Sequence, residues 1–271
     1  MKRIVSHPRV QAYAHVFMIA WQKTFAFRVS TYVQLGIASI MLVSMFYLWG
    51  TLFADQTELV GYTKQDMLTY YVLIQYLLAS IYAYVPIAQE IRDGDLSKYL
   101  TRPMNYLGYH YAHSISRRIL QLLLGLPAVI IIFLLFSGSF SIPTSLLSYT
   151  LFFFALFQAM TLLFLLDVLL GLMEFWILFS GSITFISDMI VFFLAGSYIP
   201  LEFLPGWIQI ISDVLPFKYM GAFVVNTFVG RLTISESLTG IVIQMLWIIM
   251  FAMMISVVWK RGLRRYEAVG G

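Results

Sequence analysis

The sequence predicts an all-α integral membrane protein with six transmembrane helices, and two observations support this fold class. Hydrophobic residues make up 61% of the 271 residues and charged residues only 11%, with a mean hydropathy of +0.85. A soluble domain carries about a quarter charged residues, so this composition could not cover an aqueous surface. Long charge-free stretches also recur along the chain as continuous apolar runs, whereas the strands of a membrane barrel alternate in hydrophobicity.

The charge-free stretches locate the expected helices, since crossing about 30 Å of hydrocarbon takes roughly 20 apolar residues. The stretch between Arg118 and Asp167 is too long for one helix and is interrupted by the turn-rich residues 137–144, so it holds two. A later apolar segment is interrupted only by Asp188. Within a single domain over residues 1–271, the expected spans are 31–53, 67–88, 117–137, 145–170, 175–198 and 237–259.

The distribution of basic residues predicts the orientation. Residues 1–28, 92–118 and 260–265 hold 14 of the 17 Lys and Arg residues, and six spans place these segments on one side. Because cytoplasmic segments carry an excess of Lys and Arg, both termini are expected in the cytoplasm. Within residues 1–28, Val10, Ala14, Phe17 and Trp21 recur with helical spacing, which favours an interfacial amphipathic helix over a plain cytosolic one.

The cytoplasmic connection, residues 89–116, begins with dense mixed charge. Residues 90–103 hold three acids and three bases in a chain that is otherwise poor in charge. We expect a turn at Gly94 and a short helix over Leu96–Leu100 that ends before Pro103. The charge alone fits a solvated loop and a compact docking element equally well.

The last external connection, residues 199–236, is expected to fold back into the membrane. Apolar residues with helical spacing between Pro205 and Pro216 predict a short amphipathic helix. The following segment, Tyr219–Val229, is too short to span and too apolar for an exposed loop, so we expect it to re-enter the outer leaflet against other helices. A surface-lying lid without functional importance is the alternative.

Three acids lie near or inside the expected spans. Asp167 and Glu174 flank the turn between the fourth and fifth spans, where we expect exposure to headgroups. Asp188 lies in the middle of the fifth span, where an ionisable side chain is costly and must pair, neutralise or face water. It belongs to a polar stripe with helical spacing, namely Ser180, Thr184, Ser187 and Asp188. The stripe fits a lining of a membrane path or a contact between subunits, and equally a buried packing role.

No motif predicts catalysis, a cofactor or a metal on this chain. There is no cysteine and no Gly-x-x-x-x-Gly-Lys-Ser/Thr loop to hold a nucleotide. His110 and His113 lack the paired acids of a metal site and are more simply read as interfacial histidines. Nucleic acid is not an expected partner, because the net charge of +4 comes from basic residues whose distribution is explained by the orientation in the membrane.

Two motifs together resemble the permease subunits of type-2 ATP-binding-cassette (ABC) exporters, and the resemblance extends over essentially the whole chain. The first, Glu90–Pro103, reads E-I-R-x-G-x-L-x-x-x-L-x-R-P, and the second runs from Ile199-Pro200-Leu201 through Leu204-Pro205 to Leu215-Pro216-Phe217. The resemblance implies that the first segment forms a coupling helix on a separate ATPase. It also implies that the second forms short re-entrant helices at the outer mouth.

The resemblance assigns two sets of residues. The ATPase-coupling residues would be Glu90, Arg92, Asp93, Gly94, Asp95, Leu96, Lys98, Leu100, Arg102 and Pro103. The external gate residues would be Pro200, Leu201, Pro205, Trp207, Pro216 and Phe217.

The expected function is therefore that of a permease subunit without a nucleotide site of its own. The resemblance implies a partner ATPase dimer that binds ATP and Mg, a second identical or paralogous permease, and surrounding membrane lipid. The location it implies is the bacterial cytoplasmic membrane. The alternatives are a membrane-embedded enzyme or scaffold acting without ATP, and a passive channel. The sequence does not indicate the substrate.

Overall fold

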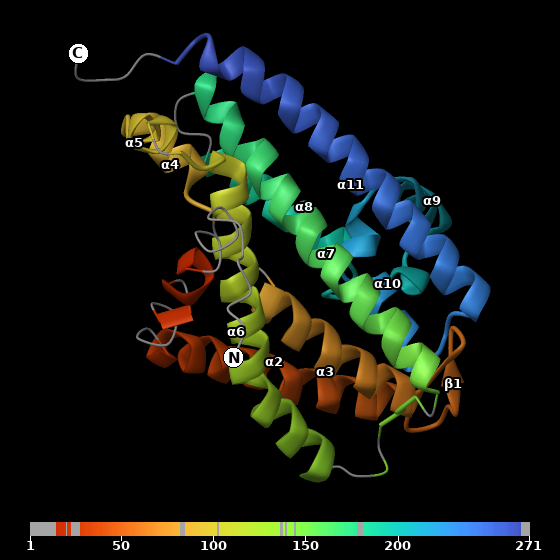
Figure 1. Cartoon of the computed structure of the whole chain (residues 1–271). Coiled ribbons are helices and arrows are strands. Elements are labelled where there is room, and N and C mark those ends of the chain that lie inside the picture. Colours follow the sequence, from red (N-terminus) through yellow and green to blue (C-terminus); the bar gives the residue numbers. More distant parts are fainter. Residues whose placement is uncertain are drawn as a thin grey trace, which may run out of the picture.

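The computed structural model describes residues 15–19, 21–22, 28–81, 85–101, 103–135, 138, 140–143, 145–177 and 181–266. This part of the chain is helical apart from one short hairpin, which confirms the predicted all-α class (Figure 1). The α-helices are α2 (Arg28–Leu52), α3 (Lys64–Ile81), α4 (Ile87–Arg92), α5 (Leu96–Leu100), α6 (Tyr106–Leu135), α7 (Leu146–Leu172), α8 (Gly181–Leu194), α9 (Gly206–Val214), α10 (Ala222–Val229) and α11 (Ile234–Leu263). Three 3-10 helices, η1 (Met173–Phe175), η2 (Leu201–Phe203) and η3 (Phe217–Met220), connect them.

Helix α7 is the centre of the fold. It is apolar on all sides and packs against α11, α6, α10 and α4, and Figure 1 shows α7 and α11 running side by side. More than half of its apolar stretch (56%) is buried, compared with 22% in each of α6 and α11. A helix that is hydrophobic all round is one that other elements surround, which matches this position.

Within the described residues, three helices are long and apolar enough to cross a membrane: α6, α11, and α7 together with η1. Two of the expected spans differ from the observed helices. The span expected over 67–88 is α3, which ends at Ile81, and a separate helix α4 begins at Ile87 after Pro86. The span expected over 175–198 is the 14-residue α8, whose length of about 21 Å is shorter than the hydrocarbon layer. The count of six crossings stays a prediction.

The connection expected over residues 89–116 is also shorter in the structure. Helix α6 begins at Tyr106, where the side chain of Asn105 accepts a hydrogen bond from the Gly108 amide at 2.8 Å. Of the expected N-terminal helix, residues 15–19 and 21–22 are helical, whereas Val10 and Ala14 lie outside the described residues.

The hydrophobic core has two parts. The larger cluster lies between α3, α6, α7, α10 and α11. The smaller one joins α4 and α5 to the start of α6 and to the C-terminal parts of α7 and α11. Figure 1 shows α4 and α5 at the end of the molecule where α7 and α11 finish.

A two-residue hairpin lies at the opposite end of the molecule (Figure 1). Strands β1 (Glu58–Leu59) and β2 (Tyr62–Thr63) pair antiparallel, with Glu58 opposite Thr63. The two turn residues, Val60 and Gly61, have φ of 49° and 75°, as a tight hairpin turn requires. Val60 therefore holds a left-handed conformation that is unfavourable for a β-branched residue.

Candidate functional site

The residues from Ile87 to Leu100 form a compact unit that we call the α4–α5 element. Its inward side chains, Ile87, Ile91 and Leu96, are buried in the smaller core. The turn at Gly94 has φ of 79°, and the helix expected over Leu96–Leu100 is present, so both local predictions are confirmed. Gly171 of α7 allows close packing, because a Cβ there would lie 3.0 Å from the Cβ of Ile87.

Glu90 points inward and ties α4 to α6. The hydroxyl of Tyr106 donates to its carboxylate at 2.6 Å, and His110 Nε2 lies 3.0 Å from the same oxygen. Burial acts to raise the pKa of Glu90, but the hydrogen bonds and charge from His110 and the Tyr106 hydroxyl outweigh it, and the pKa lies below its usual value. Glu90 is thus an anchoring residue and is turned away from the outward surface.

Two further bonds hold the turn of the α4–α5 element. Arg92 lies 3.3 Å from the carboxylate of Glu174, whose side chain is completely buried. The expectation that Glu174 is exposed to headgroups is therefore wrong, because the chain folds back at η1 and pairs it with Arg92. The hydroxyl of Tyr266, beyond α11, donates to the carbonyl of Gly94 at 2.8 Å.

The outward side of the element carries the charge. Asp93, Lys98 and Leu100 are exposed, Asp95 is half-buried and pairs with Lys98, and Pro103 is exposed just beyond α5. Arg102 lies outside the described residues. The nine described residues that the resemblance assigned to coupling thus divide into a side that faces the membrane helices and an outward side that carries most of the charge.

A buried ion pair joins α6 and α7. Arg118 is fully buried, and its Nη2 lies 3.1 Å from Oδ2 of Asp167, whose side chain is 18% exposed. Arg118 also donates to the carbonyl of Met160. The expectation that Asp167 is exposed to headgroups is therefore wrong, because its carboxylate pairs with Arg118 between α6 and α7. The partners lie 49 residues apart, so no local pattern indicates the pair.

The segment from Leu201 to Val229 forms η2, α9, η3 and α10, and we call it the η2–α10 segment. The amphipathic helix expected between Pro205 and Pro216 is α9, which is confirmed. Pro200, Pro205 and Pro216 each directly precede a helical element, where a missing amide proton costs nothing. Among the other expected gate residues, Leu201 is buried, Phe217 is half-buried and Trp207 is 65% exposed.

Helix α10 packs inside the molecule, since its residues Ala222 to Thr227 are all buried against neighbours that include α3 and α7. The packing expected for Tyr219–Val229 is therefore present. Gly221, just before α10, approaches the carbonyl of Ala195, which would lie 2.6 Å from a Cβ at this position.

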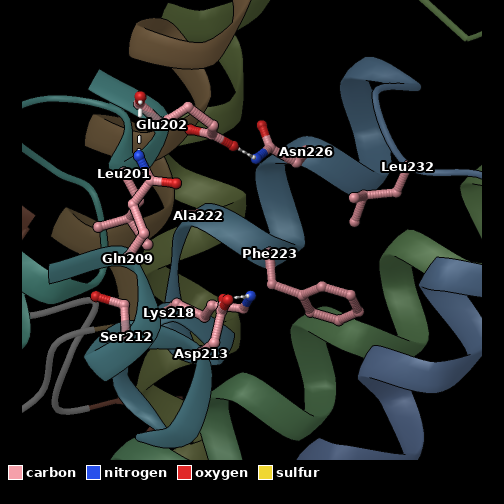
Figure 2. Close-up of a pocket in the computed structure, with 10 residues that line it drawn as sticks. All are labelled: Leu201, Glu202, Gln209, Ser212, Asp213, Lys218, Ala222, Phe223, Asn226 and Leu232. Atoms are coloured by element: carbon pink, nitrogen blue, oxygen red, sulfur yellow. Dashed lines mark hydrogen bonds and ion pairs between the residues drawn. The ribbon is translucent and has the colours of Figure 1, made fainter. Parts of the chain in front are cut away.

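A small pocket of about 120 Å³ lies between η2, α9, η3 and α10 (Figure 2). One wall is the carboxylate of Glu202, which accepts from Asn226 Nδ2 at 3.2 Å and from the hydroxyl of Tyr62 at 3.0 Å. Another contains the ion pair of Lys218 and Asp213. Figure 2 shows the hydrogen bond between Asn226 and Glu202 and the ion pair of Lys218 and Asp213 among the residues that line the pocket.

Tyr62 connects this pocket to the hairpin. Burial, followed by the charge of Glu202, raises the pKa of Tyr62 well above its usual range. The guanidinium of Arg231 lies 3.4 Å from the centre of its ring, and Arg231 also donates to the carbonyl of Gly61. The sequence reading missed this cluster, although Asn226 within an apolar segment was a usable signal.

The polar stripe lies on α8. Thr184, Ser187 and Asp188 are half-buried on this helix, next to exposed apolar residues such as Phe185 and Met189, and Ser180 lies outside the described residues. The stripe does not line the pocket beside Glu202. Among the described residues there is no group of three His, Asp or Glu side chains that could hold a metal ion.

The comparison with protein families gives one finding. A family model described as "ABC-2 family transporter protein" matches residues 39–270, which covers most of α2 and everything from α3 to α11. No curated protein matches the chain.

Proposed function

The chain belongs to the ABC-2 family of transporter proteins, and from this premise we propose that it is the permease subunit of an ATP-driven exporter. A permease of this family is a transport subunit and not a catalytic one. The chain is an integral, multi-pass membrane protein, as its apolar helices require. The proposal adds a separate ATPase, which binds ATP and Mg and supplies the energy.

The α4–α5 element carries the proposal. Its apolar side is buried among α6, α7 and α11, so the element is fixed to the membrane helices. Its opposite side presents Asp93, Asp95, Lys98 and Leu100 outward. A rigid, charged and partly apolar surface is what a docking partner needs, because complementary charges set the register and exclude wrong partners.

The proposed mechanism is a two-state movement. ATP binding closes the ATPase dimer, and the α4–α5 element moves with the surface that it contacts. Glu90 links the element to α6, Arg92 links it to η1, and Gly94 to Tyr266 beyond α11. Through these links a displacement reaches α6, η1 at the end of α7 and the segment after α11, and it opens a path toward the outside.

The rest of the assembly follows from the same proposal. A second permease, identical or paralogous, completes the path, and both termini face the cytoplasm of a bacterial cell. The η2–α10 segment forms the external gate. Asp188 lies on an apolar helix, where facing lipid would be costly, so we place it toward the path or the second subunit.

The test is to purify the full chain from its native membrane in mild detergent and to measure co-purified ATPase and ATP hydrolysis. The double change Asp93→Lys and Asp95→Lys should lower ATPase recovery about tenfold or more, because like charges would then face the partner's surface. Asp55→Lys is the matched control, since Asp55 is exposed and adjoins the hairpin at the opposite end of the molecule. The pure chain without ATPase, from membranes that keep known complexes intact, would support the enzyme or scaffold alternative.

A further inference from the structure

A second pocket lies beside the α4–α5 element. It has a volume of about 380 Å³ and is enclosed by α5, the start of α6 and the C-terminal part of α11. The residues that matter here are Tyr99, Asn105, Tyr106, Ser256, Trp259 and Lys260. Leu100, an exposed residue of the outward side of the element, also lines this pocket, so the pocket adjoins that side.

The wall of this pocket is aromatic. The rings of Tyr106 and Trp259 stack with their centres 5.1 Å apart and 14° between their planes. Tyr99 of α5 meets Tyr106 edge to face at 5.5 Å. Tyr and Trp are enriched at the boundary between hydrocarbon and headgroups, so this wall places the pocket at headgroup depth.

The charge of the pocket is positive. Lys260 is exposed at its rim, and none of the described residues that line it is acidic. The carboxylate of Glu90 lies behind the wall, where it accepts the hydrogen bond of the Tyr106 hydroxyl and pairs with His110. Asn105 adds a polar amide to the lining. An anion at the rim would therefore meet an ammonium and no opposing carboxylate.

An exposed apolar track leads from the pocket along α11. Ile249, Met253, Ser256 and Lys260 lie at positions i, i+4, i+7 and i+11, which places them along one side of the helix. Ile249 and Met253 are 49% and 58% exposed. Ile249 and Met253 are bulky side chains, whereas contacts between membrane helices favour small residues, so an acyl chain fits this part of the track better than a second helix.

We propose that this pocket binds an anionic phospholipid, with its phosphate at Lys260 and an acyl chain along the α11 track. A zwitterionic lipid fits less well, because its own ammonium group would meet Lys260. Tyr99 belongs to α5 and Tyr106 is bonded to Glu90 of α4, so the bound lipid would contact the α4–α5 element. The lipid would then adjust how firmly this element is held. Only this regulatory role rests on the proposed function.

The experiment measures lipid binding to the purified full chain by native mass spectrometry. Phosphatidylglycerol and phosphatidylcholine with the same acyl chains are titrated, together with glycerol 3-phosphate as a headgroup without chains. We expect phosphatidylglycerol to bind about fivefold more tightly than phosphatidylcholine, since one basic side chain near a membrane surface contributes about that factor.

Two matched pairs of variants locate the site. Lys260→Gln should remove the preference, whereas Arg264→Gln removes an equal, exposed charge outside the pocket and should keep it. Ser256→Phe should fill the pocket and weaken the binding of phosphatidylglycerol, whereas Val257→Phe on the neighbouring exposed surface should not change this binding. A thermal melt of each variant in the same detergent checks folding. If a variant of one pair does not fold, the other pair still decides the result.

Equal losses in Lys260→Gln and Arg264→Gln would overturn the site, because the preference would then be general attraction to a basic surface. Glycerol 3-phosphate binding as well as the lipid would also overturn it and would assign the pocket to a soluble phosphate. Binding is measured on the chain alone, so absence of an ATPase partner would refute the proposed function without affecting this result.

Discussion

Removing the carboxylate of Asp167 should destabilise the protein strongly. Arg118 is fully buried between α6 and α7 and lies 3.1 Å from Asp167, its charged partner. Asp167→Asn keeps the shape of the side chain but leaves the guanidinium without a counter-charge. The free energy of unfolding should fall because a buried cation is left without a charged partner.

The magnitude follows from two opposing contributions. At 3.1 Å and an effective dielectric constant of 20, the attraction between the charges is about 5 kcal/mol. Removing both groups from water costs several kcal/mol per ion, so the intact pair contributes little net stability compared with apolar residues. Losing one partner costs about 3 to 5 kcal/mol. We expect about 3 kcal/mol, because an unfolded chain that stays in the micelle also finds polar partners.

A double-mutant cycle tests this reasoning. The free energy of unfolding would be measured for the full chain in mixed micelles as the fraction of denaturing detergent is raised. The single changes Arg118→Met and Asp167→Leu, like Asp167→Asn, should each lose about 3 kcal/mol, whereas the double change Arg118→Met and Asp167→Leu should stay within about 1 kcal/mol of the native chain. If the double variant lost at least the sum of the two single changes, the charges would not be coupled and the argument would fail.

Three further predictions concern single positions. Gly262→Ala would place a Cβ 2.1 Å from the ring of Phe175 and should lower the free energy of unfolding by about 1 to 3 kcal/mol in the same assay. The control Gly36→Ala, whose added Cβ would have no atom within 4 Å, should raise it by up to about 1 kcal/mol. Equal effects of the two changes would contradict the packing of Gly262 against Phe175. Val60→Asn should stabilise the protein by about 1 kcal/mol, since Asn adopts a φ of 49° more readily than Val and the site is exposed. Val60→Ile, which keeps a β-branched side chain, should leave the stability unchanged. A gain in stability from both changes would contradict backbone strain at Val60. Because the folded-state pKa of Glu90 is lowered, the stability that its carboxylate contributes is complete above about pH 4.3 and is lost as the pH falls through the folded pKa. Glu90→Gln should therefore flatten the acid side of a plot of melting temperature against pH. An unchanged plot would contradict this role of Glu90.

Features that depend on neighbouring residues could be predicted from the sequence. Helix α5 follows the Gly94 turn, and α9 lies between two prolines, so local backbone preferences set both. Composition predicts a membrane protein, because so few charged residues could not cover an aqueous surface, and the continuous apolar runs predict helices instead of strands. The expectation that Tyr219–Val229 packs against other helices rested on the same balance of length and polarity.

Features that depend on distant residues could not be predicted. Glu90 and His110 lie 20 residues apart, and Tyr62 and Asn226 lie 164 residues apart. Their contacts arise only when helices pack, and a pattern along one helix carries no information about its neighbour. Hydropathy alone likewise missed the separate start of α4, since the apolar run continues through Val85 and Pro86, which are not helical.

Because the α4–α5 element is fixed to the membrane helices, it is a suitable position for a label that reports its motion. The chain contains no cysteine, so Lys98→Cys would create a single attachment point for a spin label or a fluorophore. Lys98 is exposed on α5, whereas the other side of the element is buried against the membrane helices. A label there would report the motion of the whole element, and under the proposed function its signal should change when nucleotide is added to the complex with the ATPase.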